Sequence, residues 1–196
     1  MRQLALPLLV ALLLGFVVSG CGPAPRNLDK VDWADVAVPG SVCGVGHPIE
    51  LRRSRAVVTS TRWPSMPRVT VEAGWNPVVY GDLDADGRDE AALVVDCNNG
   101  GGMADGVLAY AQVIFTSAGP APRVIGVVTP QQRRDPNGLP TLVTVRIRPG
   151  KIIAREAWYG PRDATCCPSG RTTTIWTYAK GRLNAGIPTV ERAASR

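Results

Sequence analysis

Short apolar and β-branched runs alternate with Gly, Pro, Asn and Asp along most of the chain. Apolar positions recurring every second residue, bounded by turn-forming residues, are typical of β-strands. The pattern therefore predicts strands through most of the chain. The expected segments are 56–60, 68–73, 77–80, 90–96, 107–116, 123–129, 142–148, 151–158, 172–179 and 187–190.

Two links between these strands are short enough to form hairpins. One crosses Pro149 and Gly150, and the other crosses Lys180 and Gly181 before the chain reaches Leu183. Two-residue links of this kind join neighbouring antiparallel strands. We expect a hairpin at each of them.

Only one segment, residues 28–36, has the features of a helix, with Asn27 or Asp29 as its N-cap. Its apolar pattern is weak, and helical stretches long enough for βαβ crossovers are missing. We therefore expect a mainly β fold, a single antiparallel β-rich domain with at most a short N-terminal helix. An α+β fold is the alternative.

The N-terminal segment has a different pattern. Arg2 precedes an apolar run over residues 4–18 that only Pro7 and Gly15 interrupt. A positive start, an apolar stretch and small residues after it are typical of a secretion signal. The run is shorter than the roughly 20 residues that a membrane-spanning helix needs. Residues 1–20 are therefore expected to be a signal peptide.

The run ends in Val18-Ser19-Gly20-Cys21, which resembles the bacterial lipobox. The resemblance implies that Cys21 is linked to diacylglycerol and becomes the first mature residue. Two or three acyl chains, such as palmitate, give stable membrane attachment. This predicts a protein on the extracytoplasmic face of the bacterial cell membrane. An ordinary signal peptide followed by a chance cysteine is the alternative.

The segment after Cys21 is short, polar and proline-bearing, as in a flexible tether. We expect an acylated tether over residues 21–30, a β-rich extracytoplasmic domain over residues 31–190 and a flexible tail over residues 191–196.

The chain is basic, with 22 Lys and Arg against 16 Asp and Glu, a net charge of +6. Such a balance favours anionic surfaces. Because the arginines are spread along the chain, an inert basic surface is the simpler interpretation. No aromatic residue stands beside the basic run at residues 52–55, so a nucleic-acid partner is not expected. The expected partners are the membrane and either anionic envelope polymers or an envelope protein.

An acidic loop over residues 82–90 separates two predicted strands and has the sequence Asp-Leu-Asp-Ala-Asp-Gly-Arg-Asp-Glu. Carboxylates at positions one, three and five converge on one point, and glycine at position six allows the sharp turn that wraps a hard cation. An EF-hand needs flanking helices and a Glu at position twelve, which is Leu93 here. We therefore exclude an EF-hand.

This loop resembles the loop of FG-GAP and VCBS-type repeats. The resemblance implies a Ca²⁺ site formed by the side chains of Asp82, Asp84, Asp86 and Glu90 with the carbonyl of Arg88. The motif occurs once, so a propeller of such repeats is excluded. Any calcium would be structural, with a dissociation constant on the order of 0.1 to 1 mM. The alternative is a turn in which the Asp side chains bond their own backbone, with Arg88 as a partial counter-charge.

Four cysteines remain besides Cys21: Cys43, Cys97, Cys166 and Cys167. In an oxidising compartment an even number of cysteines predicts disulfides. Our first choice pairs Cys43 with Cys97 and leaves Cys166 and Cys167 as a vicinal pair. The two crossed pairings remain alternatives. A zinc site would need two spaced cysteine pairs, usually with His.

A wider resemblance covers about half of the mature chain. Residues 166–170, the Arg-Thr-Thr-Thr-Ile-Trp run after them and a Gly-Arg-Leu turn look like the C-terminal signature of actinobacterial LppP/LprE-type lipoproteins. Residues 80–91 and 97–101 are similar to a motif of related secreted domains. The resemblance implies a location and an architecture, and it supplies no catalytic residue.

The motifs of the common enzyme classes are missing. The chain has one histidine, His47, no Gly-x-Ser-x-Gly pentapeptide and no phosphate-binding loop at residues 100–102. We expect a non-catalytic binding or scaffolding lipoprotein without a catalytic cofactor. The alternative is an accessory lipoprotein that presents a small ligand or assists an envelope enzyme. A broad apolar pocket would favour the alternative, and a convex polar surface would favour scaffolding.

Overall fold

The computed structural model describes residues 27–66, 68–100, 106–117, 121–132, 138–164 and 166–191. The predicted signal peptide, the lipobox with Cys21, most of the tether and residues 192–196 of the tail lie outside this range. The described residues form a mainly β fold whose paired strands are antiparallel, as predicted. The strands are β1 (Ala37–Val38), β2 (Ile49–Glu50), β3 (Arg55–Thr59), β4 (Arg68–Ala73), β5 (Val79–Gly81), β6 (Glu90–Asn98), β7 (Val107–Thr116), β8 (Arg123–Val128), β9 (Thr141–Arg148), β10 (Lys151–Trp158), β11 (Gly170–Ala179), β12 (Arg182–Ala185) and β13 (Thr189–Val190).

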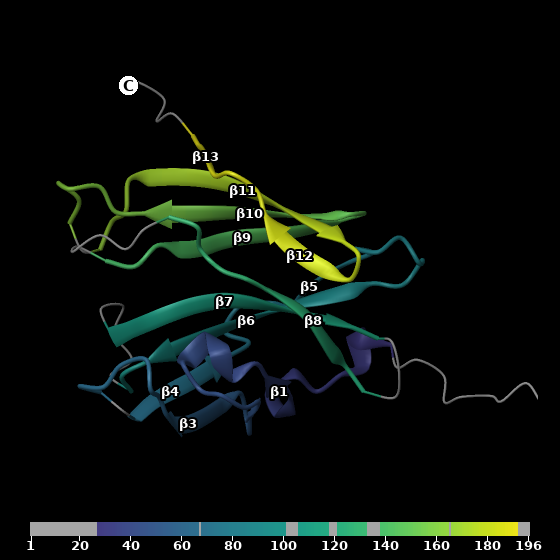
Figure 1. The fold of residues 1–196 in the computed structure, drawn as a ribbon, viewed down its shortest axis with the longest axis horizontal. Coiled ribbons are helices and arrows are strands. Elements are labelled where there is room, and N and C mark those ends of the chain that lie inside the picture. Colours follow the sequence, from purple (N-terminus) through teal and green to yellow (C-terminus); the bar gives the residue numbers. More distant parts are fainter. Residues whose placement is uncertain are drawn as a thin grey trace, which may run out of the picture.

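Two large sheets stack as layers, and the N-terminal segment packs on the outer face of one of them (Figure 1). The first sheet has the order β3-β4-β6-β7-β8, with β5 paired to β6. The second has the order β12-β11-β10-β9, with β13 paired to β11. A separate small sheet joins β1 and β2.

Strand β6 lies in the middle of these layers and is buried along its whole length. Leu93, Val95 and Cys97 point into a core shared with the N-terminal segment. Ala92 points into a second core, between the two large sheets. Because β6 is covered on both faces, its sequence is a nearly continuous apolar run.

Both predicted hairpins are present. Pro149 and Gly150 join β9 to β10, with Gly150 in the left-handed region at φ 74°. Lys180 and Gly181 join β11 to β12, with φ of 52° and 73°. The Lys180–Gly181 turn thus has positive φ at both central residues, the geometry that matches the twist of antiparallel strands, whereas in the other turn only Gly150 has positive φ.

The expected N-terminal helix is replaced by two short 3₁₀ turns, η1 (Leu28–Lys30) and η2 (Trp33–Asp35). Val31 between them is extended, and the side chain of Asp32 accepts a hydrogen bond from the backbone N–H of Ala34. Asp favours such caps over helix interiors, so it interrupts the helix. A third 3₁₀ turn, η3, spans Gly40–Cys43.

The pattern also missed β1, β2 and most of β12. The first two are only two residues long, too short to show a period. In the described part of the chain, none of the helices has the length and apolar character needed to cross a membrane.

Candidate functional site

The acidic loop connects β5 to β6, which pair directly at Gly81 and Glu90. Leu83 turns inward from the loop and is fully buried in the core between the sheets. Its carbonyl accepts a hydrogen bond of 2.7 Å from the N–H of Gly150 in the β9–β10 turn. The base of the loop is therefore fixed to both sheets.

Three aspartates organise the exposed side of the loop. Asp84 accepts the N–H of Asp86 at 3.2 Å, and Asp86 accepts the N–H of Arg88 at 2.9 Å. Asp82 accepts the N–H of Gly87 at 3.0 Å through Oδ2. These are the bonds of an Asp-rich turn. The alternative in which the Asp side chains bond the backbone of their own loop therefore describes part of the loop correctly.

The same three aspartates form a group that could hold a metal ion. One carboxylate oxygen from each of Asp82, Asp84 and Asp86 lies within 4.8 Å of the other two. Ligands on opposite sides of a Ca²⁺ ion are about 4.6 to 5.2 Å apart, because each Ca–O distance is about 2.3 to 2.6 Å. The Oδ1 atom of Asp82 is buried and has no hydrogen-bond partner within the described residues. The donor set therefore fits a hard cation.

Arg88 competes for this group. Its guanidinium donates to Oδ2 of Asp86 through Nε at 2.9 Å and through a second nitrogen. The hydrogen bond from Arg88 lowers the pKa of Asp86, and Asp86 in turn raises the pKa of Arg88. A cation bound by Asp86 would have to displace Arg88 from that oxygen.

Glu90 does not belong to the cluster that the sequence predicts. The group of converging oxygens within the described residues contains the three aspartates and not Glu90. Glu90 is 1% exposed, and its Oε2 accepts the backbone N–H of Leu83 at 2.8 Å. Burial raises the pKa of Glu90. Its place in the β5–β6 ladder goes with a side chain that is turned inward and buried, although the charge of Asp84 is still near enough to contribute to the raised pKa of Glu90.

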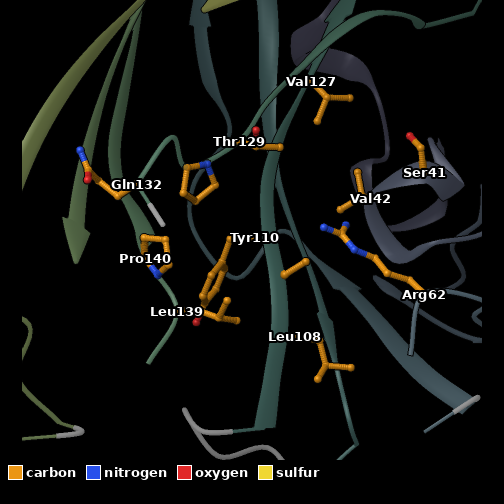
Figure 2. Close-up of a pocket in the computed structure, with 12 residues that line it drawn as sticks. Ser41, Val42, Arg62, Leu108, Tyr110, Val127, Thr129, Gln132, Leu139 and Pro140 are labelled. Carbon is orange, nitrogen blue, oxygen red and sulfur yellow. The ribbon is translucent and has the colours of Figure 1, made fainter. Parts of the chain in front are cut away.

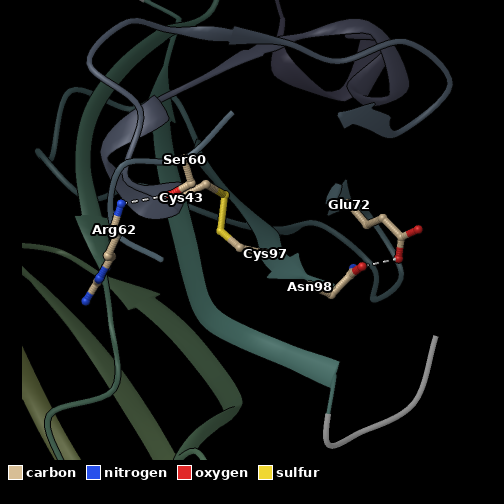
Figure 3. Close-up of a disulfide and its surroundings, with 6 residues drawn as sticks. All are labelled: Cys43, Ser60, Arg62, Glu72, Cys97 and Asn98. Carbon is tan, nitrogen blue, oxygen red and sulfur yellow. Dashed lines mark hydrogen bonds between the residues drawn. A yellow bond between two sulfur atoms is a disulfide. The ribbon is translucent and has the colours of Figure 1, made fainter. Parts of the chain in front are cut away.

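The first-choice disulfide is present. Cys43, at the end of η3, is bonded to Cys97 on β6 with a Cα–Cα distance of 5.6 Å, and both are fully buried (Figure 3). It staples the N-terminal segment to the central strand. Nearby, the amide of Asn98 donates to Glu72 at 3.3 Å.

The second pair is also bonded, as a vicinal disulfide between Cys166 and Cys167. Asp163 closes the surrounding loop by accepting the backbone N–H groups of Gly160 and Ser169 at 2.7 and 2.8 Å and the Ser169 hydroxyl. These hydrogen bonds lower the pKa of Asp163.

Sequence reasoning missed a fully buried glutamate between the sheets. Glu156 on β10 accepts the Thr174 hydroxyl at 2.9 Å through Oε1. Through Oε2 it accepts the backbone N–H groups of Gln131 and Gln132 at 2.8 and 3.1 Å. Its position two residues after Ala154, on the inner face of β10, is the signal that could have found it.

A second missed feature is a polar patch on β6 and β7. Asp96 and Gln112 are each 7% exposed, and each has a buried oxygen without a hydrogen-bond partner among the described residues. Burial and the nearby charge of Glu72 raise the pKa of Asp96 to about 6. Tyr110 stands opposite Asp96 in the ladder, and burial raises its pKa too.

A cavity of about 400 Å³ opens beside Tyr110 (Figure 2). Ser41, Val42 and Arg62 line it on the side of the N-terminal segment, and Gln132 and Pro140 are among the residues on the side of the second sheet. Its size falls within the range of small-ligand pockets.

Comparison of the chain with known protein families, curated proteins and solved structures gives no match.

Proposed function

We propose that this chain is a lipoprotein held on the extracytoplasmic face of the bacterial membrane by an acylated Cys21, and that its β domain has a non-catalytic binding role. The observation that carries the proposal is Val18-Ser19-Gly20-Cys21 directly after the apolar run. The two disulfides support an oxidising compartment, where such bonds persist. The resemblance to LppP/LprE-type lipoproteins supports the same location.

Anchoring is tested by fractionation and intact-mass measurement of the full chain. The wild type should be in the membrane fraction, cleaved before Cys21 and carrying acyl chains. Cys21→Ala should be released or remain an uncleaved precursor. Ser19→Ala, which keeps a small residue in the lipobox, is the matched control and should behave as the wild type. Unchanged fractionation and mass of Cys21→Ala would exclude the anchor.

Of the two roles expected from the sequence, the cavity beside Tyr110 supports the presentation of a ligand over scaffolding by a convex surface alone. The cavity joins apolar walls to a few polar side chains, including Ser41, Arg62 and Gln132. This combination is usual for binding sites. Anionic envelope polymers remain a candidate partner for the basic surface.

We further infer that Asp82, Asp84 and Asp86 bind a Ca²⁺ ion and that the role of this ion is structural. The ligands are oxygens only, which Ca²⁺ prefers, and the loop links β5 to β6 next to the buried Leu83. The chemistry that the ion supplies is neutralisation of three converging carboxylates. Asp82 would contribute its unpartnered Oδ1.

Thermal unfolding with millimolar Ca²⁺ or with chelator tests this inference. Calcium should raise the melting temperature of the wild type, because an ion that binds only the folded state stabilises it. The double variant Asp84→Ala with Asp86→Ala should lose this response. Arg88→Gln should strengthen it, since Arg88 no longer occupies the Asp86 oxygen. If the melting temperature of the wild type does not change with calcium, the inference of a calcium site is wrong, and the loop is a turn in which the Asp side chains bond their own backbone.

A further inference from the structure

One edge of strand β7 lacks a partner over half of its length. Strand β6 pairs with one side of β7 from Val107 to Phe115. On the other side, β8 pairs only with residues 112–116. In the described part of the chain, no strand pairs with residues 107–111 on that side. Alternate backbone N–H and C=O groups of these residues therefore face the place where β8 would continue.

Two features of the sequence after β8 explain why the chain does not continue beside β7. After Val128, the last residue of β8, Pro130 has no N–H with which to continue the ladder. The next two backbone N–H groups, of Gln131 and Gln132, bind the buried carboxylate of Glu156 on the second sheet. The segment is thus drawn across to the other layer, and within the described residues no strand continues β8 along this edge of β7, which leaves the edge open there.

The cavity lies along this open edge. Leu108, Ala109 and Tyr110 of β7 line it, and Figure 2 shows side chains of the N-terminal layer and of the β8–β9 connection on opposite sides of the strand. An edge between two walls is a groove in which one extended segment fits. The five residues 107–111 of this open edge span about 17 Å, which is the length of strand that a bound segment could pair with.

One wall of the groove carries a positive charge that none of the described acidic side chains pairs with. The guanidinium of Arg62 takes part in none of the hydrogen bonds or ion pairs within the described residues, and it lies over the ring of Trp63, 5.4 Å from the ring centroid. Ser41 and Tyr110 add hydroxyl groups to the same cavity. A guanidinium without an acidic partner is suited to bind the carboxylate of a ligand, because it can do so with two parallel hydrogen bonds.

We propose that the groove beside β7 binds an extended peptide segment that carries a carboxylate. The peptide adds a strand to the open edge at residues 107–111, and its carboxylate pairs with Arg62. Backbone bonds supply affinity in such strand addition, and side-chain pockets supply selectivity. The groove also explains how an exposed edge is kept from unspecific pairing, since walls on both sides limit access to it. This proposal rests on the binding role proposed above and names its partner class.

The first experiment captures peptides on the full chain, purified in mild detergent. The probe is a pool of acetylated hexapeptides, randomised without Cys and Pro, in two forms with a free or an amidated C-terminus. Bound peptides should be enriched in β-branched residues and should carry a carboxylate. Enrichment from the amidated pool of peptides with Asp or Glu assigns the carboxylate to a side chain, whereas loss of binding in that pool assigns it to the C-terminus.

The strongest binder is then measured by fluorescence anisotropy. Arg62→Gln should weaken it by about threefold to tenfold, in line with an exposed charged hydrogen bond. Arg123→Gln is the matched control. This variant removes the same charge from Arg123, an exposed residue at the start of β8 that does not line the cavity. Its affinity for the peptide should stay within about twofold of that of the wild type. A peptide methylated at alternate backbone nitrogens should lose at least about tenfold, because those nitrogens can no longer donate.

Several outcomes would overturn the proposal: no enriched peptide, equal binding of the methylated peptide, or equal binding by the Arg62 and Arg123 variants. A dimer of the chain that excludes the peptide would also overturn it and would assign the edge to a second copy. None of these results affects the mass measurement at Cys21 or the calcium response. Failure of this site is therefore distinguishable from failure of the proposed anchor.

Discussion

Glu90 accepts the backbone N–H of Leu83 at 2.8 Å, and both residues are buried beneath the acidic loop. The carboxylates of the loop therefore have two different structural roles. The three aspartates hold the exposed side of the turn, and Glu90 satisfies backbone groups on its inner side. The role of Glu90 can be tested separately because Glu90 can be changed while the three aspartates are kept, with its exposed neighbour Asp89 as the control.

Glu90→Ala should lower the free energy of unfolding by about 1 to 3 kcal/mol, because the Leu83 N–H is left buried without an acceptor. Glu90→Gln keeps one acceptor oxygen and should cost less. Asp89→Ala is the control and should change stability by less than about 0.5 kcal/mol. Urea denaturation measures all three. Equal losses for Glu90→Ala and Asp89→Ala would contradict the structural role of Glu90.

The two disulfides should differ greatly in their contribution to stability. Cys43 and Cys97 are 54 residues apart, so replacing both by Ala should cost about 4 kcal/mol in the loop-entropy model. The matched control replaces Cys166 and Cys167, which are adjacent and restrain the unfolded chain very little. Denaturation of the two double variants gives the comparison. Alkylation of the folded wild type should find no free thiol at these four positions, and two modified cysteines would disprove the pairing.

Asp96 should make the protein less stable as pH rises. Its pKa in the folded state is about 6, above the usual 3.8, because burial and the charge of Glu72 disfavour the carboxylate. The folded state therefore holds this proton more tightly than the unfolded state between pH 4 and pH 6. Stability from this group is complete below pH 4 and is lost as pH rises through 6. We expect a loss of about 2 kcal/mol, after allowing for solvent screening.

The measurement is the difference in free energy of unfolding between the wild type and Asp96→Asn from pH 4 to pH 7. The variant cannot ionise at this position, so the difference isolates Asp96 from the raised pKa of Glu90 and the lowered pKa of Asp163. A difference that stays constant with pH would show that Asp96 has an ordinary pKa.

Most of the strands and both hairpins could be predicted because each has a local signal. The Cys43–Cys97 pairing has none, since it joins residues 54 positions apart and is our first choice among three possible connectivities. The β9–β10 turn needs only Pro149 and Gly150, and β6 needs only its apolar run. The direction of Glu90 could not be predicted in this way. In the motif it takes the position of a ligand, but its pairing with Gly81 turns it into the core.

The open edge of β7 could not be predicted either, because it depends on where a distant segment goes. Glu156 shares the inner face of β10 with Ala154, so its burial follows from the strand period. Its partners Gln131 and Gln132 lie 24 and 25 residues earlier in the chain and have no local pattern that links them to it. Contacts of this kind decide where β8 ends.

Glu156→Ala should therefore change the groove as well as the stability. It removes the acceptor for two backbone N–H groups and for the Thr174 hydroxyl, and should cost about 3 kcal/mol. The amides of Gln131 and Gln132 should exchange their hydrogens faster than in the wild type, because their partner is gone. The neighbouring Arg155→Ala breaks only an exposed pair with Glu191 and should cost less than about 1 kcal/mol without affecting these amides. If Glu156→Ala leaves the two exchange rates unchanged, Glu156 does not hold this segment, and another cause must end β8 and leave the edge of β7 open.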